Sequence, residues 1–273
     1  MNETPGEALD SWLPAPGSDL YYAHLYAPNG ARRALLTIAS LRQAIAGIPA
    51  SCSAPTIALP KLAWWRDELG QLARGTPRHA ITRGLIDFDP ALPAAGLALV
   101  EGVENMLGAP HFPTLAARRG AFVSAHGPLW ACALRRCLPA ESGVAPEALA
   151  LAGLVEEIAA LRDARPQLEC QMALLTDETI AAATRKAGTL PVAAGDWYAA
   201  VLGEDLAALR AELARELSVL EGRANLRPLA TLARLNLTLV SEILHSGCRV
   251  WETRTELTPL RKLWLAWRER FSL

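Results

Sequence analysis

The most informative feature of the sequence is a segment that lacks acidic residues. The 273 residues include 28 Asp and Glu against 27 Lys and Arg, yet none of the acidic residues lies between Ala34 and Pro60. The formal net charge is −1, so the chain has no overall positive field that would attract a polyanion. We therefore expect no nucleic-acid partner.

The common motifs of metal and nucleophile chemistry are also missing. The five cysteines are widely spaced, and no C-x-x-C occurs. This pattern predicts reduced thiols rather than a disulfide framework or a zinc site. The five histidines show neither H-x-x-x-H nor H-E-x-x-H spacing, and the chain has no G-x-S-x-G, Walker loop or dinucleotide fingerprint. These absences argue against zinc proteases, serine hydrolases and nucleotide-dependent enzymes.

Targeting and membrane-spanning segments are not evident either. The first residues contain no basic region followed by an apolar run, and no uncharged apolar run approaches the roughly 20 residues that cross a bilayer. We expect a cytoplasmic protein that can also associate peripherally with a membrane.

Helical periodicity, interrupted by Gly and Pro, is the pattern that is present throughout. It predicts an all-α chain that forms one domain over residues 1–273, with 1–18 as an irregular lead-in and 49–60 as a loop. The expected helices cover about 21–26, 31–46, 61–74, 91–107, 115–137, 146–162, 178–187, 190–202, 206–220 and 227–251, and a last one begins at Pro259.

Several short motifs occur in a characteristic order along the chain. They are Tyr21-Tyr22, R-R-A-L-L at 32–36, K-L-A-W-W-R-D-E-L at 61–69, L-R-D at 161–163, T-D-E at 176–178 and L-R-K-L-W-L at 260–265. Together they resemble the squalene/phytoene synthase family, which joins two prenyl diphosphates on magnesium. The resemblance spans about residues 21–268 and implies an isoprenoid-synthase-like helical bundle around a central cavity.

The resemblance also implies a first aspartate motif, D-D-x-x-D, on residues 46–50. Here Ala46, Gly47 and Ala50 occupy the three carboxylate positions, and Gln43 stands where the family has an arginine. Pro49 disfavours a continued helix, because a proline inside a helix costs about 3 kcal/mol. We therefore expect the helix that should carry the metal ligands to end there.

The second aspartate motif, N-x-x-x-D-x-x-x-D, is also degenerate. Asp163 matches its central residue, but Ala159 replaces the Asn and Gln167 replaces the last Asp. Glu156, in the place of a family Gln, shares a helix face with Asp163. These two carboxylates are weak candidates for a single rebuilt metal site. We expect no catalytic residue and no cofactor, with magnesium required only if the chain is an active transferase.

Basic and aromatic residues leave two further alternatives open. Arg32 and Arg33, like Arg118 and Arg119, either contact an anion in the cavity or lie on a solvated helix surface. Glu156 and Glu157 are expected to pair with Arg162 along their helix. The helix at 259–271 either contacts a membrane or turns Trp264 and Trp267 inward with its basic tips in water.

Three functions are compatible with these observations. The first is a catalytically inactive relative whose cavity binds a long-chain isoprenoid or lipid, or which binds a protein partner. The family offers a precedent in a branch associated with assembly of respiratory complex I. The second is an active prenyl-diphosphate transferase of isoprenoid biosynthesis with an atypical metal site. The third is an unrelated helical interaction protein.

Overall fold

The chain folds into a bundle of α-helices. The computed structural model describes residues 9–27, 31–109, 111–139, 141–187, 194–219 and 223–272. The helices are α2 (Asp19–Ala23), α3 (Arg32–Ala46), α4 (Pro55–Ala73), α5 (Ala80–Arg83), α6 (Leu92–Met106), α7 (Leu115–Arg135), α8 (Pro146–Arg162), α9 (Ala164–Glu169), α10 (Asp177–Ala187), α11 (Ala194–Val219), α12 (Arg227–His245) and α13 (Pro259–Ser272). Two 3-10 turns, η1 (Pro49–Ser51) and η2 (Ala224–Leu226), supplement them.

The predicted all-α class is confirmed. In the described ranges only two isolated bridges have β geometry, Leu107 with Met172 and Phe112 with Thr176. None of the helices in those ranges combines the length and the hydropathy that crossing a membrane requires. The single domain over 1–273 stays a prediction, and residues 1–8 of the expected lead-in lie outside the described residues.

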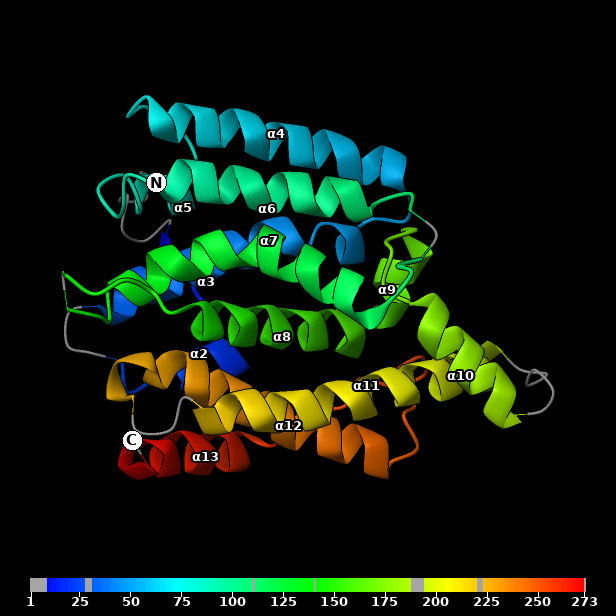
Figure 1. Cartoon of the computed structure of the whole chain (residues 1–273). Helices are drawn as coiled ribbons and strands as arrows, with labels where there is room; N and C mark the ends of the chain where they lie inside the picture. Colours follow the sequence, from blue (N-terminus) through cyan, green and yellow to red (C-terminus); the bar gives the residue numbers. More distant parts are fainter. Residues whose placement is uncertain are drawn as a thin grey trace.

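The helices form layers between two outer edges. Helices α4 and α6 form one edge of the bundle, α3, α7 and α8 lie in its middle, and α13 forms the opposite edge (Figure 1). The buried apolar side chains of these layers join into one core that extends from Leu9 to Leu265. Trp130 and Phe122 of α7 are among the largest side chains that are fully buried in it.

Helix α4 begins earlier than predicted, and the expected loop at 49–60 is wrong. The segment contains the turn η1 and then the first residues of α4, which starts at Pro55. Proline suits a first helical position because its missing N–H would have no helical partner there. Pro60 lies inside α4 with both it and Thr56 exposed, so water can solvate the Thr56 carbonyl that Pro60 leaves free.

Helix α11 is one continuous element from Ala194 to Val219, so the predicted break between 202 and 206 is wrong. The start predicted at 190 lies outside the described residues. Helix α12 ends at His245, six residues before the predicted end at 251. Gly247 and Cys248 follow with φ of 83° and 56°, a left-handed backbone that cannot continue the helix.

The W-W-R-D-E motif has a structural role on α4. Trp65 is buried against His79, whereas Trp64 is partly exposed. The buried carboxylate of Glu68 accepts hydrogen bonds from the backbone N–H groups of Arg78 and His79, each 2.8 Å long. Burial alone would raise the pKa of Glu68, but these bonds hold it below its usual value. The motif therefore fixes the loop between α4 and α5.

Candidate functional site

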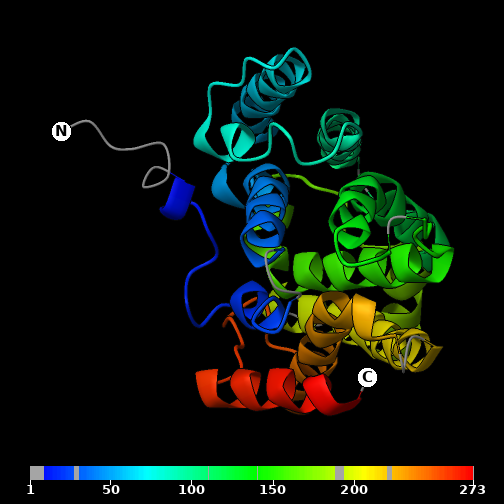
Figure 2. The same cartoon turned by 90° about the vertical axis from the view of Figure 1, so that its left-hand side faces the viewer.

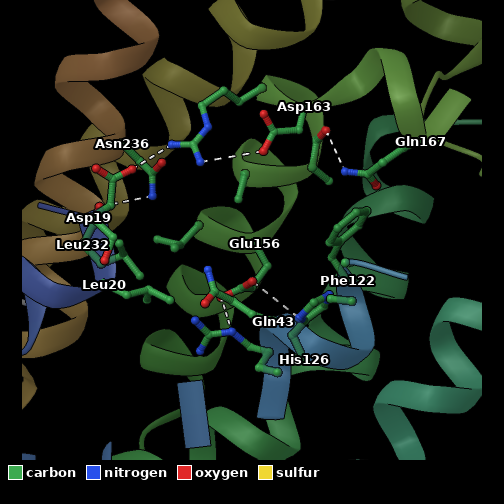
Figure 3. Close-up of a pocket in the computed structure, with 18 of the residues that line it drawn as sticks. Asp19, Leu20, Gln43, Phe122, His126, Glu156, Asp163, Gln167, Leu232 and Asn236 are labelled. Carbon is green, nitrogen blue, oxygen red and sulfur yellow. Dashed lines mark hydrogen bonds and ion pairs between the residues drawn. The ribbon is translucent and has the colours of Figure 1, made fainter. Parts of the chain in front are cut away.

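A cavity of about 470 Å³ lies among α2, α3, α8 and α12, with α7 at its back (Figure 3). Seven of the eight degenerate motif positions line it, namely Gln43, Ala46, Gly47, Glu156, Ala159, Asp163 and Gln167. Ala50, which follows the end of α3 on η1, is not part of the lining. Two segments more than 100 residues apart in the sequence thus meet at one cavity, which the motif alignment anticipated.

The backbone at position 47 of the first motif leaves no room for a carboxylate. Helix α3 ends at Ala46, and Gly47 caps it with an N–H that donates to the carbonyl of Gln43. A Cβ atom added to Gly47 would lie 2.7 Å from that carbonyl oxygen, closer than real Cβ contacts allow. An aspartate at position 47 would therefore require the backbone to shift.

The second motif is divided between two helices. Helix α8 ends at Arg162, because Asp163 adopts φ −105° and ψ 37° outside the helical region. Gln167 therefore lies on α9, where its side-chain amide donates a 3.2 Å hydrogen bond to the carbonyl of Ala160. The residue at the last aspartate position stabilises the end of α8 instead of holding a metal.

Glu156 lies at the centre of a buried cluster at the back of the cavity. Its Oε1 is 2.9 Å from Arg42 Nε and accepts a 2.9 Å hydrogen bond from Trp130 Nε1. The guanidinium of Arg42 lies 4.5 Å from the centre of the Trp130 ring. His126 Nδ1 is 3.6 Å from Glu156 Oε2, too far for a hydrogen bond. Burial lowers the pKa of His126 to about 4, although Glu156 partly opposes this shift, so the ring is neutral at pH 7.

A second set of charges surrounds the rim of the cavity. Asp19 of α2 is 2.7 Å from Arg162 and 2.8 Å from Lys262 of α13. Burial would raise the pKa of Asp19, but Lys262 and Arg162 lower it below its usual value. Asp163 is 3.3 Å from Arg254, which also contacts Glu256 at 3.2 Å. Arg254 and Glu256 are exposed, so they mark the opening.

The side chains of the cavity do not fit a magnesium–diphosphate clamp. The lining contains four carboxylates and four Arg or Lys side chains, and each carboxylate is paired with at least one of these basic groups. Among the described residues, no three or more His, Cys, Asp or Glu side chains are grouped so that they could hold a metal ion. Magnesium in such sites takes carboxylate oxygens together with substrate phosphate, and these carboxylates are already engaged.

Arg32 and Arg33, the possible anion contacts, do not line the cavity. They lie in the first turn of α3, whereas the cavity is formed by its last turns. Arg33 pairs with Asp10 at 2.7 Å, and Arg32 lies over the Tyr21 ring. The basic residues at the cavity are instead Arg42, Arg162, Arg254 and Lys262. Arg42 adjoins the motif position Gln43, and Arg162 and Lys262 lie within quoted motifs, whereas Arg254 had no sequence signal.

The expected pairing of Glu156 and Glu157 with Arg162 is also wrong. Glu157 points away from the cavity and contacts Arg118 and Arg119 of α7, each at 2.6 Å. Arg118 is fully buried and also pairs with Asp205 of α11 at 3.0 Å. The two arginines therefore neither face the cavity nor lie on a solvated surface. They join α7, α8 and α11 inside the bundle.

Comparisons with known proteins identify the fold and a similarity to one family. The family model described as squalene/phytoene synthase matches residues 13–118. A dehydrosqualene synthase crystal structure in complex with ligand aligns with TM-score 0.69 and 15% identity over 93% of this chain and 90% of that one. The squalene synthase HpnC from Alicyclobacillus acidocaldarius aligns with TM-score 0.57 and 14% identity over 84% of this chain and 89% of that one.

A search of curated protein sequences finds no significant match. The two solved structures establish the predicted isoprenoid-synthase fold. The family model ends at residue 118, so beyond it the resemblance is supported by the shared fold alone. The family match over residues 13–118 and the fold shared over nearly the whole chain confirm the resemblance to the squalene/phytoene synthase family.

Proposed function

We propose that this chain is a squalene/phytoene synthase-like protein that does not catalyse prenyl transfer and instead binds a long-chain isoprenoid or lipid in its cavity. The observation that carries the proposal is the pairing of every cavity carboxylate with an arginine or lysine. We further propose that the protein needs no magnesium.

The pairing matters because the chemistry of the family depends on carboxylates that are free to bind metal ions. Ionisation of an allylic diphosphate leaves a negatively charged group that divalent cations must neutralise. Glu156 could bind a metal only by giving up its ion pair with Arg42. The buried guanidinium of Arg42 would then have lost its partner, which is energetically unfavourable. At position 47 the backbone itself opposes a carboxylate. Both motif helices therefore support a site that no longer assembles a metal cluster.

The shape and lining of the cavity support a ligand with an apolar chain and a polar end. Its volume of about 470 Å³ falls within the range of about 300–1,000 Å³ that is usual for ligand sites. Leu20, Val103, Phe122, Val155 and Leu232 provide buried apolar wall. The charged groups around Asp19 and Arg254 lie at the opening, where a polar head group would remain in contact with water.

The absence of catalysis is tested by incubating the purified protein with farnesyl or geranylgeranyl diphosphate and magnesium. We expect neither squalene, nor phytoene, nor a cyclopropyl intermediate by mass spectrometry. Formation of any of these products in proportion to protein concentration would contradict the proposal.

Ligand binding is tested by extracting the purified protein and identifying long-chain molecules in the extract. We expect a co-purifying lipid that is lost when Ala159→Trp fills the cavity, because Ala159 lines it. Ala181→Trp is the matched control, since Ala181 lies exposed on α10 away from the lining. If both variants and the native protein contain no ligand, the cavity proposal is wrong and a role in binding a protein partner takes its place.

An active transferase with an atypical metal site remains the competing proposal, and one observation favours it. Glu156 and Asp163, the two weak candidates for a rebuilt metal site, both face the cavity. If they bind a metal with substrate, magnesium and a prenyl diphosphate together should raise the melting temperature more than either alone. We expect no such magnesium-dependent increase.

A further inference from the structure

Helix α13 presents its apolar face to solvent. Leu260, Leu263, Trp264, Trp267 and Phe271 recur at spacings of three and four residues, which places them on one side of the helix. Their exposed fractions are 80%, 38%, 51%, 48% and 67%. Such a stripe is the reverse of the usual arrangement, in which the apolar side of a surface helix faces the core.

Ion pairs fix the helix in this orientation. Lys262 and Glu269 lie on the inner side and are 5% and 1% exposed. Lys262 Nζ is 2.8 Å from Asp19 and donates a hydrogen bond to the carbonyl of Gly17, and Glu269 is 2.9 Å from Arg234 of α12. Rotating the helix to bury its tryptophans would break both pairs. The expectation that Trp264 and Trp267 turn inward is therefore wrong.

Exposed arginines border the apolar stripe. Arg268 lies over the Trp264 ring at 4.7 Å, and Arg270 is close to the Phe271 ring at 5.8 Å. Arg261 is exposed as well and pairs with Glu242 of α12 at 2.7 Å. Glu269 is the single acidic residue of α13, and it is buried on the inner side. The outer face of this helix is thus apolar and positive, without an acidic group.

We propose that the outer face of α13 docks the protein onto an anionic lipid bilayer. Tryptophans next to basic residues are typical of the membrane interface, where the rings enter the head-group region and the cations meet anionic lipid. Helix α13 forms an outer edge of the molecule in both views, so a flat surface can reach it (Figures 1 and 2).

Charge argues for a bilayer over a second copy of the chain. A two-fold dimer through this face would bring the same surface of both copies together. Arg268 and Arg270 of one copy would then lie near those of the other, and like charges at an interface are unfavourable. An anionic bilayer complements the same arginines and also takes up the exposed aromatic rings.

The position of the cavity adds a consequence of docking. Glu256 lies three residues before the start of α13 and Lys262 belongs to it, and both line the cavity. A bilayer in contact with α13 would therefore lie beside the rim through which a lipid could enter. The docking surface itself depends only on α13, so it can be tested independently of the proposed ligand.

The test is flotation of the full chain with vesicles of phosphatidylcholine mixed with phosphatidylglycerol, and with phosphatidylcholine alone. At low salt we expect binding to the anionic vesicles that weakens as salt is added. The variant Trp264→Ala/Trp267→Ala should bind at least about tenfold more weakly, because it removes the two interfacial rings. Arg268→Glu/Arg270→Glu should lose at least about tenfold on the anionic vesicles.

The matched control is Trp64→Ala, at a tryptophan that is 43% exposed on α4 at the opposite edge of the bundle. It should bind vesicles like the native protein. Circular dichroism checks that each variant retains its helices, as expected for changes at exposed side chains. Three results would overturn the proposal: no native binding at low salt, equal flotation of the Trp264→Ala/Trp267→Ala variant, or a native dimer without vesicles that this variant abolishes.

Discussion

Two neighbouring glutamates on α8 belong to different regions of charge. Glu156 faces the cavity and meets Arg42, with Trp130 and His126 close by. Glu157 faces the interior and meets Arg118 and Arg119. The first region adjoins a space that a ligand can fill, whereas the second is closed and joins three helices.

The difference separates charges that a ligand can reach from charges that hold helices together. The carboxylate of Glu157 is fully buried and both of its oxygens are paired, as stability requires of a charge inside a protein. In the cavity, by contrast, four carboxylates are balanced by four Arg or Lys side chains around an open space. The contrast predicts that the interior region determines folding, and that the cavity region responds to pH and ligand.

The largest effect is expected from Glu157→Gln. The change leaves the buried guanidinium of Arg118 with only Asp205 as a charged partner, so the free energy of unfolding should fall by about 3–5 kcal/mol. Urea denaturation measures this loss. Glu169→Gln is the control, because that carboxylate is exposed and pairs only with Arg165 one turn away, so the change should be within about 0.5 kcal/mol. Similar losses in the two variants would show that the interior network is not a main source of stability.

An acid-side loss of stability should come next, from the buried histidines. The pKa of His126 is 6.5 in the unfolded chain and about 4 in the folded chain. Between these pH values the unfolded chain therefore binds a proton at His126 and the folded chain does not. The contribution of the neutral His126 to the free energy of unfolding is therefore complete above pH 6.5. It falls by about 3 kcal/mol as the pH is lowered to 4.

The variant His126→Gln should reduce the slope of stability against pH in this range. His24, buried on α2's C-terminal side with a pKa of about 4, should contribute a similar share. Denaturation at a series of pH values measures both. An unchanged slope for His126→Gln would place the pH response outside the cavity cluster.

A smaller loss is expected from Glu156→Gln. Arg42 would lose its charged partner, but the cavity admits water to this cluster and Gln can still accept the hydrogen bond from Trp130. We expect about 2 kcal/mol, less than for Glu157→Gln. Urea denaturation under the same conditions compares the two variants directly. A loss equal to or greater than that of Glu157→Gln would remove the distinction between an open and a closed region.

The sequence predicts local features of this fold well. The bounds of α8 and the start of α13 match their predictions, because proline at the first helical position marks both starts. The end of α3 before Pro49 is likewise predicted from Gly47 and Pro49. The motif alignment also places two distant segments at one cavity, since a shared fold brings the corresponding residues together.

Partners that come from distant segments could not be predicted. Arg119 and Glu212 are 93 residues apart in the sequence, and their contact depends on how α7 and α11 pack. Gln167 follows Asp163 at the four-residue spacing of the motif, and only the backbone reveals that it lies on the separate helix α9. The outward tryptophans of α13 depend on Lys262 and Glu269, whose partners lie on other segments.

The two backbone features at Gly47 and Asp163 bear on whether a cluster of aspartates could be built at this cavity. Substituting aspartate at positions 46, 47, 50 and 167 would change the side chains but not the path of the backbone. The crowded Gly47 would resist its new side chain, and the residue at 167 would still project from α9 rather than from α8. Building such a cluster would therefore require remodelling two helix ends together, which point substitutions alone would not achieve.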